Sequence, residues 1–222
     1  MFGIYTATLL LILFSCAPAF AQGGRTPAPS TVSPASSSID KLDLGATMRL
    51  IQDKLNAQGK LSFQAVGIFT PAAPSKPVRM VSETSFTISD ALTDAGRCTL
   101  ALRSVDESRD DTGARSKQES SVRLSLRDVE SLEIQSVIDG YKTGVERNTT
   151  WDVFPPTFIL HILLNSGKSY QDHSRFTDEK GVSTETEGEM RGGFWLYFGE
   201  EDAARQIAEA MERAADLCNS QK

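Results

Sequence analysis

Hydrophobic residues recur at helical spacing near both ends of the folded part of the chain. The first stripe consists of Leu44, Met48, Ile51 and Leu55. It predicts a helix over residues 43–58, with Asp43 as its N-cap and Gly59 just past its end. The second stripe consists of Ala204, Ile207, Ala208, Met211, Ala215 and Cys218. It predicts an amphipathic helix over residues 200–218, whose acidic first turn suits the helix dipole.

Between these helices the pattern changes to short alternating runs separated by polar turns, which is typical of strands. Strands are expected over residues 61–69, 79–88, 97–105, 120–127, 131–141, 157–164 and 193–198. The fourth alternates apolar and polar residues, so one of its faces should be wet. Residues 157–164 and 193–198 are apolar at both parities, so both faces of these strands should be covered. The polar segment 166–192 is expected to be a mobile loop.

The start of the chain has the pattern of a secretory signal. Residues 4–14 are apolar but too short to span a membrane, and Ala19 and Ala21 occupy the small-residue positions of a cleavage site. A signal peptide over residues 1–21 is therefore expected. Alternatively, Cys16 ends a lipobox-like stretch and becomes the lipid-carrying first residue of a lipoprotein.

Residues 22–38 are rich in Ser and Pro and nearly lack large apolar groups, which predicts a disordered linker. The remaining residues, 39–222, are expected to form one globular domain with an N-terminal helical extension. Export after cleavage leaves two cysteines, Cys98 and Cys218, in an oxidising compartment. Because the strand and helix periodicities direct both into the core, they are expected to form a disulfide; alternatively, they remain two inert buried thiols.

Composition limits the classes of partner. The chain has 222 residues, 40% hydrophobic and 23% charged, with a formal net charge of -6. An acidic balance without a basic cluster argues against nucleic acid and against an anionic membrane surface. No segment after the signal is apolar enough to cross a bilayer.

The order of these elements resembles the pleckstrin-homology-like (PH-like) superfold, in which seven antiparallel strands form a barrel or sandwich capped by a C-terminal helix. The phrases TMRLIQDKLN, RCTLAL, VRLSLRDVESLEI and FWLYFGEEDAARQIAEAMERAADLC look like those of uncharacterised exported bacterial proteins. The resemblance implies an α+β, mainly β fold and a protein- or peptide-binding surface, commonly a groove between the last helix and a neighbouring strand. Phosphoinositide binding is not expected, because the first hairpin loop carries only Lys76 and Arg79 as basic residues.

Motifs for catalysis, metals or cofactors are not evident. His161 is expected to be a structural residue within a strand, and His173 a solvated one in a polar loop. The segment GVERNTTWDVFPP is expected to be a loop that carries Trp151 and Phe154, aromatics of the kind that anchor protein interfaces. Alternatively, Trp151 plugs one end of the barrel.

These observations predict a noncatalytic, periplasmic or secreted module that binds a protein, a peptide or an envelope component, with no cofactor. A carrier of a small apolar ligand is the alternative, suggested by the strands that are apolar on both faces. A hydrolase that uses carboxylates alone is a third reading.

Overall fold

The computed structural model describes residues 39–70, 76–144 and 149–221, all within the compact unit Ser33–Lys222. The predicted signal peptide, the linker and Cys16 lie outside the described residues. The described part is mainly β. Its helices are α2 (Leu44–Ala57), α3 (Val137–Gly144) and α4 (Glu201–Ser220), with one short 3-10 helix, η1 (Leu126–Asp128). The first helix predicted from the sequence is α2 and the last is α4, so both predictions are confirmed.

Ten strands are described, three more than the sequence predicted. They are β1 (Lys60–Phe69), β2 (Val78–Asp94), β3 (Thr99–Asp110), β4 (Arg115–Ser125), β5 (Val129–Ser136), β6 (Thr149–Phe154), β7 (Phe158–Leu164), β8 (Ser169–Thr177), β9 (Ser183–Arg191) and β10 (Gly193–Phe198). They form an antiparallel seven-stranded sheet in the order β6-β1-β2-β3-β4-β8-β9 and a three-stranded sheet in the order β10-β7-β5. No closed barrel is found among the described residues.

Two expectations about loops are wrong. The polar segment 166–192 forms the β8–β9 hairpin, and the segment with Trp151 and Phe154 forms β6, which pairs with β1. Strand β9 is almost wholly exposed, so it lacks the apolar alternation by which a strand is recognised in sequence. Backbone pairing with β8, together with polar side-chain contacts such as Arg175 with Glu185 at 3.8 Å, maintains it as the last strand of the sheet.

The predicted strand 131–141 is wrong in its second half, where the chain turns into α3. Ser136 precedes the helix, and its hydroxyl accepts from the N–H of Asp139 at 3.2 Å and donates to the Asp139 carboxylate at 2.6 Å. This Ser-x-x-Asp pattern resembles a capping box, which favours helix over strand at this position. The apolar residues that suggested a strand, Val137 and Ile138, therefore belong to a helix.

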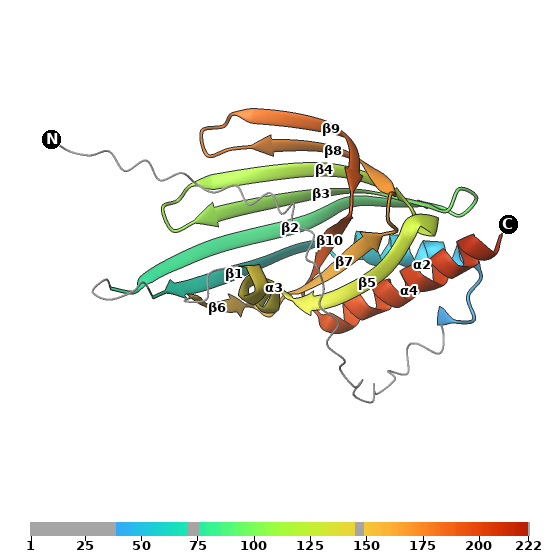
Figure 1. The fold of residues 1–222 in the computed structure, drawn as a ribbon, viewed down its shortest axis with the longest axis horizontal. Helices are drawn as coiled ribbons and strands as arrows, with labels where there is room; N and C mark the ends of the chain where they lie inside the picture. The colour runs from blue at the N-terminus through green and yellow to red at the C-terminus, as the bar shows by residue number, and fades with distance from the viewer. Residues whose placement is uncertain (1–38, 71–75, 145–148, 222) are drawn as a thin grey trace. The chain divides into compact units, whose positions relative to one another are not determined.

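The core lies where the two helices meet the sheets. Figure 1 shows α2 and α4 side by side at one end of the larger sheet, with β10, β7 and β5 crossing in front of it. Buried side chains of α4, such as Ile207 and Met211, join Leu100 and Leu124 of the larger sheet and Leu160 of the smaller one. The alanines of α4 allow this close approach, because their small methyl side chains do not hold the helix away from the sheets. In β10, Phe194, Leu196 and Phe198 are buried whereas Trp195 is 47% exposed, so only one face of this strand is fully covered.

Two side chains of α2 bond the backbone of β2 where this strand extends beyond the end of β1. The amide of Asn56 donates to the carbonyl of Ala91 at 2.9 Å and accepts from the N–H of Ala91 at 2.8 Å. Gln52, one turn earlier, accepts from the N–H of Thr93 at 2.9 Å. The two amides replace a neighbouring strand, so these backbone groups of β2 have partners where β1 has ended.

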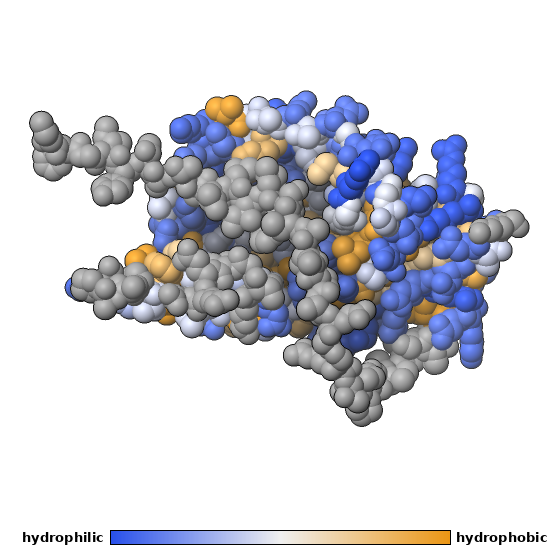
Figure 2. Space-filling view, in the orientation of Figure 1, coloured by the Kyte–Doolittle hydropathy of each residue, from blue (hydrophilic) through white to orange (hydrophobic). Residues whose placement is uncertain are grey.

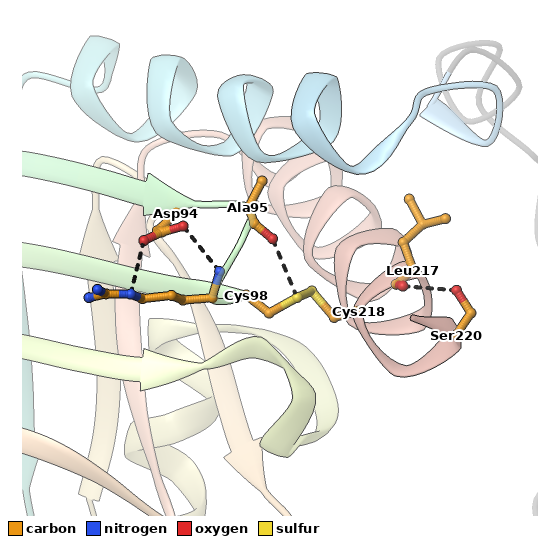
Figure 3. Close-up of a disulfide and its surroundings, with 7 residues drawn as sticks. Asp94, Ala95, Cys98, Leu217, Cys218 and Ser220 are labelled. Atoms are coloured by element: carbon orange, nitrogen blue, oxygen red, sulfur yellow. Dashed lines mark hydrogen bonds and ion pairs between the residues drawn. A yellow bond between two sulfur atoms is a disulfide. The ribbon is translucent and has the colours of Figure 1, made fainter. Parts of the chain in front are cut away.

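The predicted disulfide is present and joins Cys98 to Cys218 (Figure 3). Cys98 closes the turn between β2 and β3, and Cys218 lies near the end of α4; both are fully buried. The Cys98 sulfur lies 3.8 Å from the carbonyl oxygen of Ala95, a van der Waals contact because a bridged sulfur carries no hydrogen. The bridge therefore ties the last helix to the β2–β3 turn of the larger sheet.

Candidate functional site

A groove of about 380 Å³ runs between β5 and α4. Its lining residues are Leu132, Ile134, Glu201, Arg205, Ala208, Glu209 and Glu212. The five residues of α4 follow the spacing of one helix face, and Leu132 and Ile134 share one face of β5 because side chains alternate along a strand. The floor is thus apolar and the helix side charged. In Figure 2, hydrophilic residues cover much of the surface where α4 lies in Figure 1.

Strand β5 is an edge strand within the described residues, because β7 is its only strand neighbour there. The N–H of Val137, just after β5, donates to the carbonyl of Thr157 at 2.8 Å. In an antiparallel ladder, residues that bond across to the partner alternate with residues that point away from it. Given the register Ile134 to Leu160, the N–H and C=O groups of Leu132 and Ile134 therefore point away from β7, toward the open edge.

Acidic residues dominate the helix side of the groove. Glu201 is paired with Arg205 at 2.5 Å, one turn along the helix. Glu212 lies further along, and burial, followed by repulsion from Glu209 and Asp216, raises the pKa of its carboxyl above the usual range. Because carboxylates at this spacing repel each other, this part of the helix favours a cationic group beside it.

A second group of titratable residues lies on the side of the larger sheet that carries the core. Burial, with a smaller contribution from Glu107, raises the pKa of Asp106 to about 6. The charge of Asp106 in turn adds to burial in raising the pKa of Tyr141 and Tyr197. Tyr197 packs against Phe86 and Phe63, with ring centroids 5.3 and 5.7 Å away. The groups that interact electrostatically with Asp106 thus include Glu107, on the other face of β3, and the two tyrosines.

The two predicted interface aromatics point to opposite faces of β6. Trp151 stacks on Tyr141, with ring centroids 4.5 Å apart, and its ring covers Gly67, where a Cβ atom would come within 2.8 Å of it. Phe154, on the other face, is 77% exposed. Trp151 is thus a packing residue, although the described residues form no closed barrel that it could plug, and of the two aromatics Phe154 is the exposed one.

The two histidines lie in strands. His161 is half-buried in β7, its ring centroid 5.5 Å from that of Trp195, and burial lowers its pKa. This is consistent with the predicted structural role. His173 is exposed as predicted, but it lies in β8 and not in a loop, opposite Ser121 and Glu187.

Within residues 39–70, 76–144 and 149–221, no three His, Cys, Asp or Glu side chains are grouped so that they could hold a metal ion. None of the helices in that part of the chain is long and apolar enough to cross a membrane.

The chain matches no protein-family model, and no curated protein or solved structure is significantly similar to it. The PH-like resemblance therefore stays a prediction. The groove between β5 and α4 was anticipated only through that resemblance. Sequence periodicity alone could not reveal it, because the edge position of β5 depends on which strands pair.

Proposed function

We propose that this protein is an exported, noncatalytic binding module that takes an extended basic peptide segment into the groove between β5 and α4. The observation that carries the proposal is the open edge of β5 beside an acidic helix face. A PH-like fold would place a peptide surface in the same location.

The edge of β5 supplies the backbone part of the recognition. Leu132 and Ile134 each present a donor and an acceptor that β7 does not use, so an added strand would extend the three-stranded sheet. Such pairing gives affinity with little dependence on sequence. Their side chains, half-buried in the groove, offer apolar contact to every second residue of the bound strand.

The acids of α4 supply selectivity. Burial and, to a smaller extent, the neighbouring acids raise the pKa of Glu212, and a lysine or arginine of the ligand would offset the repulsion between these carboxylates. An acidic segment would be repelled by the same residues. The module would therefore prefer basic over acidic strands of equal β propensity.

A direct test uses two short peptides, one of alternating lysine and valine and one of alternating glutamate and valine, titrated into isotopically labelled protein. We expect the lysine peptide to shift the backbone amide resonances of Leu132 and Ile134, and the glutamate peptide to leave them unchanged. Equal shifts with both peptides, or shifts elsewhere only, would count against the proposal.

The variant Ile134→Pro tests the edge, together with the Ile134 side chain that lines the groove. Proline removes an N–H that points away from β7, and prolines are tolerated in edge strands at such positions. Peptide affinity should fall at least about tenfold while the fold persists. Glu133→Pro is the matched contrast, because it removes a donor of the β5–β7 ladder and should destabilise the protein. Unchanged peptide affinity in Ile134→Pro would exclude strand addition at β5.

Carriage of a small apolar ligand is the second candidate. It is favoured by the aromatic face formed by Tyr197, Phe63 and the partly exposed Trp195. The test is a fluorescent apolar probe whose emission changes on binding. Binding to the unaltered protein and loss of binding in Trp195→Ala would support this candidate over peptide binding.

A further inference from the structure

A larger depression, of about 640 Å³, lies on the face of the seven-stranded sheet that points away from the core. It is separate from the groove between β5 and α4. The sheet buries Phe63, Phe86 and Leu102 on the face that carries the core. Residues one position away on each strand point to the other face. The depression is lined by such residues of six strands, by the intervening Phe63, Thr84, Ser108 and Ser116, and by Pro155 after β6 and Asp178 after β8.

Strand register arranges the lining in two rows that cross the sheet. One row consists of Ser62, Ser85, Glu107, Lys117 and Thr177. The other consists of Phe154, Gln64, Glu83, Arg109 and Arg115. The small side chains of Ser62 and Ser85 leave room between taller residues on either side. The depression therefore has an aromatic end at Phe154 and a basic end at the two arginines.

Arg109 and Arg115 are directly opposite each other on β3 and β4. Like charges in this position destabilise a sheet unless something neutralises them. Glu83, directly opposite Arg109, accepts from the neutral amide of Gln64 at 3.4 Å and keeps its charge, whereas Glu107 is paired with Lys60 at 3.8 Å and Glu119 with Lys117 at 2.6 Å. Neither guanidinium has an ion pair or hydrogen bond with any residue that the structure describes.

The hairpin tip that joins the two arginines is held in place by its own hydrogen bonds. One carboxylate oxygen of Asp110 accepts from the N–H of Thr112 at 2.9 Å, the N–H of Ala114 at 3.0 Å and the hydroxyl of Thr112 at 2.6 Å. These bonds lower the pKa of Asp110, the hydroxyl bond most. Gly113 supplies the positive φ of 86° that the turn requires. Asp110 is therefore committed to the turn and is not a counter-ion for the arginines.

Phe154 lies at the far end of the same row, 77% exposed. Three strand spacings separate it from Arg109, a distance of about 14 Å. Its ring offers a large apolar surface that a ligand could cover. Two arginines that form no ion pair with any described residue and one exposed aromatic ring are thus arranged along one depression.

We infer that this face binds an amphiphilic organic oxyanion, with its carboxylate, phosphate or sulfate head between Arg109 and Arg115 and its apolar body extending toward Phe154 and Pro155. The guanidinium fork matches the paired oxygens of such heads, and an ammonium group does not offer this geometry. The body crosses the floor of small serines. A bound head relieves the repulsion between the two arginines, which an uncharged ligand cannot do.

The test titrates the labelled mature chain with three probes: inorganic phosphate, decyl phosphate below its micelle concentration, and decyl glucoside as an uncharged amphiphile. We expect decyl phosphate to bind most tightly, to shift the side-chain Nε resonances of both arginines, and to bind less well at high salt. Arg109→Ala and Arg115→Ala should each weaken it about tenfold. Phe154→Ala should weaken the binding of decyl phosphate and leave the binding of inorganic phosphate unchanged.

Arg123→Ala is the matched control, because Arg123 lies on the same face of β4 but outside the depression, opposite Ala101 and Gln171. It should change decyl phosphate binding less than twofold. Equal losses in Arg123→Ala and Arg109→Ala would show general attraction to positive charge and overturn the site. Equal binding of decyl glucoside, or no saturable shift at either arginine, would overturn it as well.

Discussion

Cys98, in the turn between β2 and β3, is covalently joined to Cys218, 120 residues later in α4. Cys98 also has a positive φ of 55°, the only such value for a non-glycine residue in the described part of the chain. A left-handed conformation costs a residue with a side chain roughly 1–2 kcal/mol. The bridge, together with the hydrogen bond from the N–H of Leu126 to the carbonyl of Cys98 at 2.8 Å, maintains this turn.

Removing the bridge should destabilise the protein strongly. For a closed loop of this length the chain-entropy model gives ~4 to 5 kcal/mol. We expect the double variant Cys98→Ser, Cys218→Ser to lose a comparable free energy of unfolding, measured by urea denaturation under nonreducing conditions. A loss below about 1 kcal/mol would mean that the unfolded chain stays compact without the bridge.

Asn56→Ala should destabilise the junction of α2 with β2. It leaves the N–H and C=O groups of Ala91 without their side-chain partner, at a cost of about 1 to 2 kcal/mol, because the site is partly buried. Asp53→Ala, an exposed change on the same helix, should stay within about 0.5 kcal/mol of the unaltered protein. Thermal unfolding of the two variants compares them, and equal midpoints would refute the role assigned to Asn56.

The stability of the protein should depend on the ionisation of Asp106. Its pKa is raised from 3.8 to about 6 in the folded state, so the folded state holds the proton longer than the unfolded state. Stability is then unaffected below about pH 4, falls as pH rises toward 6, and stays lower above it. Asp106→Asn should be more stable than the unaltered protein at pH 8, by at most about 3 kcal/mol, and equal to it near pH 3.5. A pH-independent difference between them in denaturant midpoints would argue against this cause.

Glu212→Gln should separate stability from binding. The raised pKa of Glu212 means that its ionised form disfavours the folded state at neutral pH, so the amide should unfold at a slightly higher temperature there. The same change should weaken binding of the lysine–valine peptide, because the groove loses a carboxylate. If the variant binds that peptide as tightly as before, charge selection by α4 is wrong, while strand addition to β5 is still tested by Ile134→Pro.

Export can be read from the product itself. Expressed at full length in a bacterial host, the chain should give a fractionated product that begins at Gln22, with an intact mass two units below that of the reduced chain. A lipid-modified species that begins at Cys16 would instead establish the lipoprotein alternative and direct the search for partners to the membrane surface.

Local patterns in the sequence account for much of the fold. The stripes that end in Leu55 and Cys218 predicted both long helices, because a helix with one buried face must repeat its apolar residues at nearly the same angle. Alternation around Leu124 located the central strands for the same kind of reason. Cys98 and Cys218 could be paired because each continued an apolar face.

Other features depended on the tertiary structure. Strand β9 could not be predicted from the sequence. Both of its faces are exposed, so its apolar and polar residues do not alternate. The open edge of β5, the placement of Arg109 against Arg115 and the exposure of Phe154 follow from strand order and register, which join residues far apart in the sequence. The sequence by itself determined which faces of each helix and most strands are buried, since that depends on local periodicity. Only the tertiary structure decided which edges and charges were left without partners, because pairing between strands is a nonlocal choice.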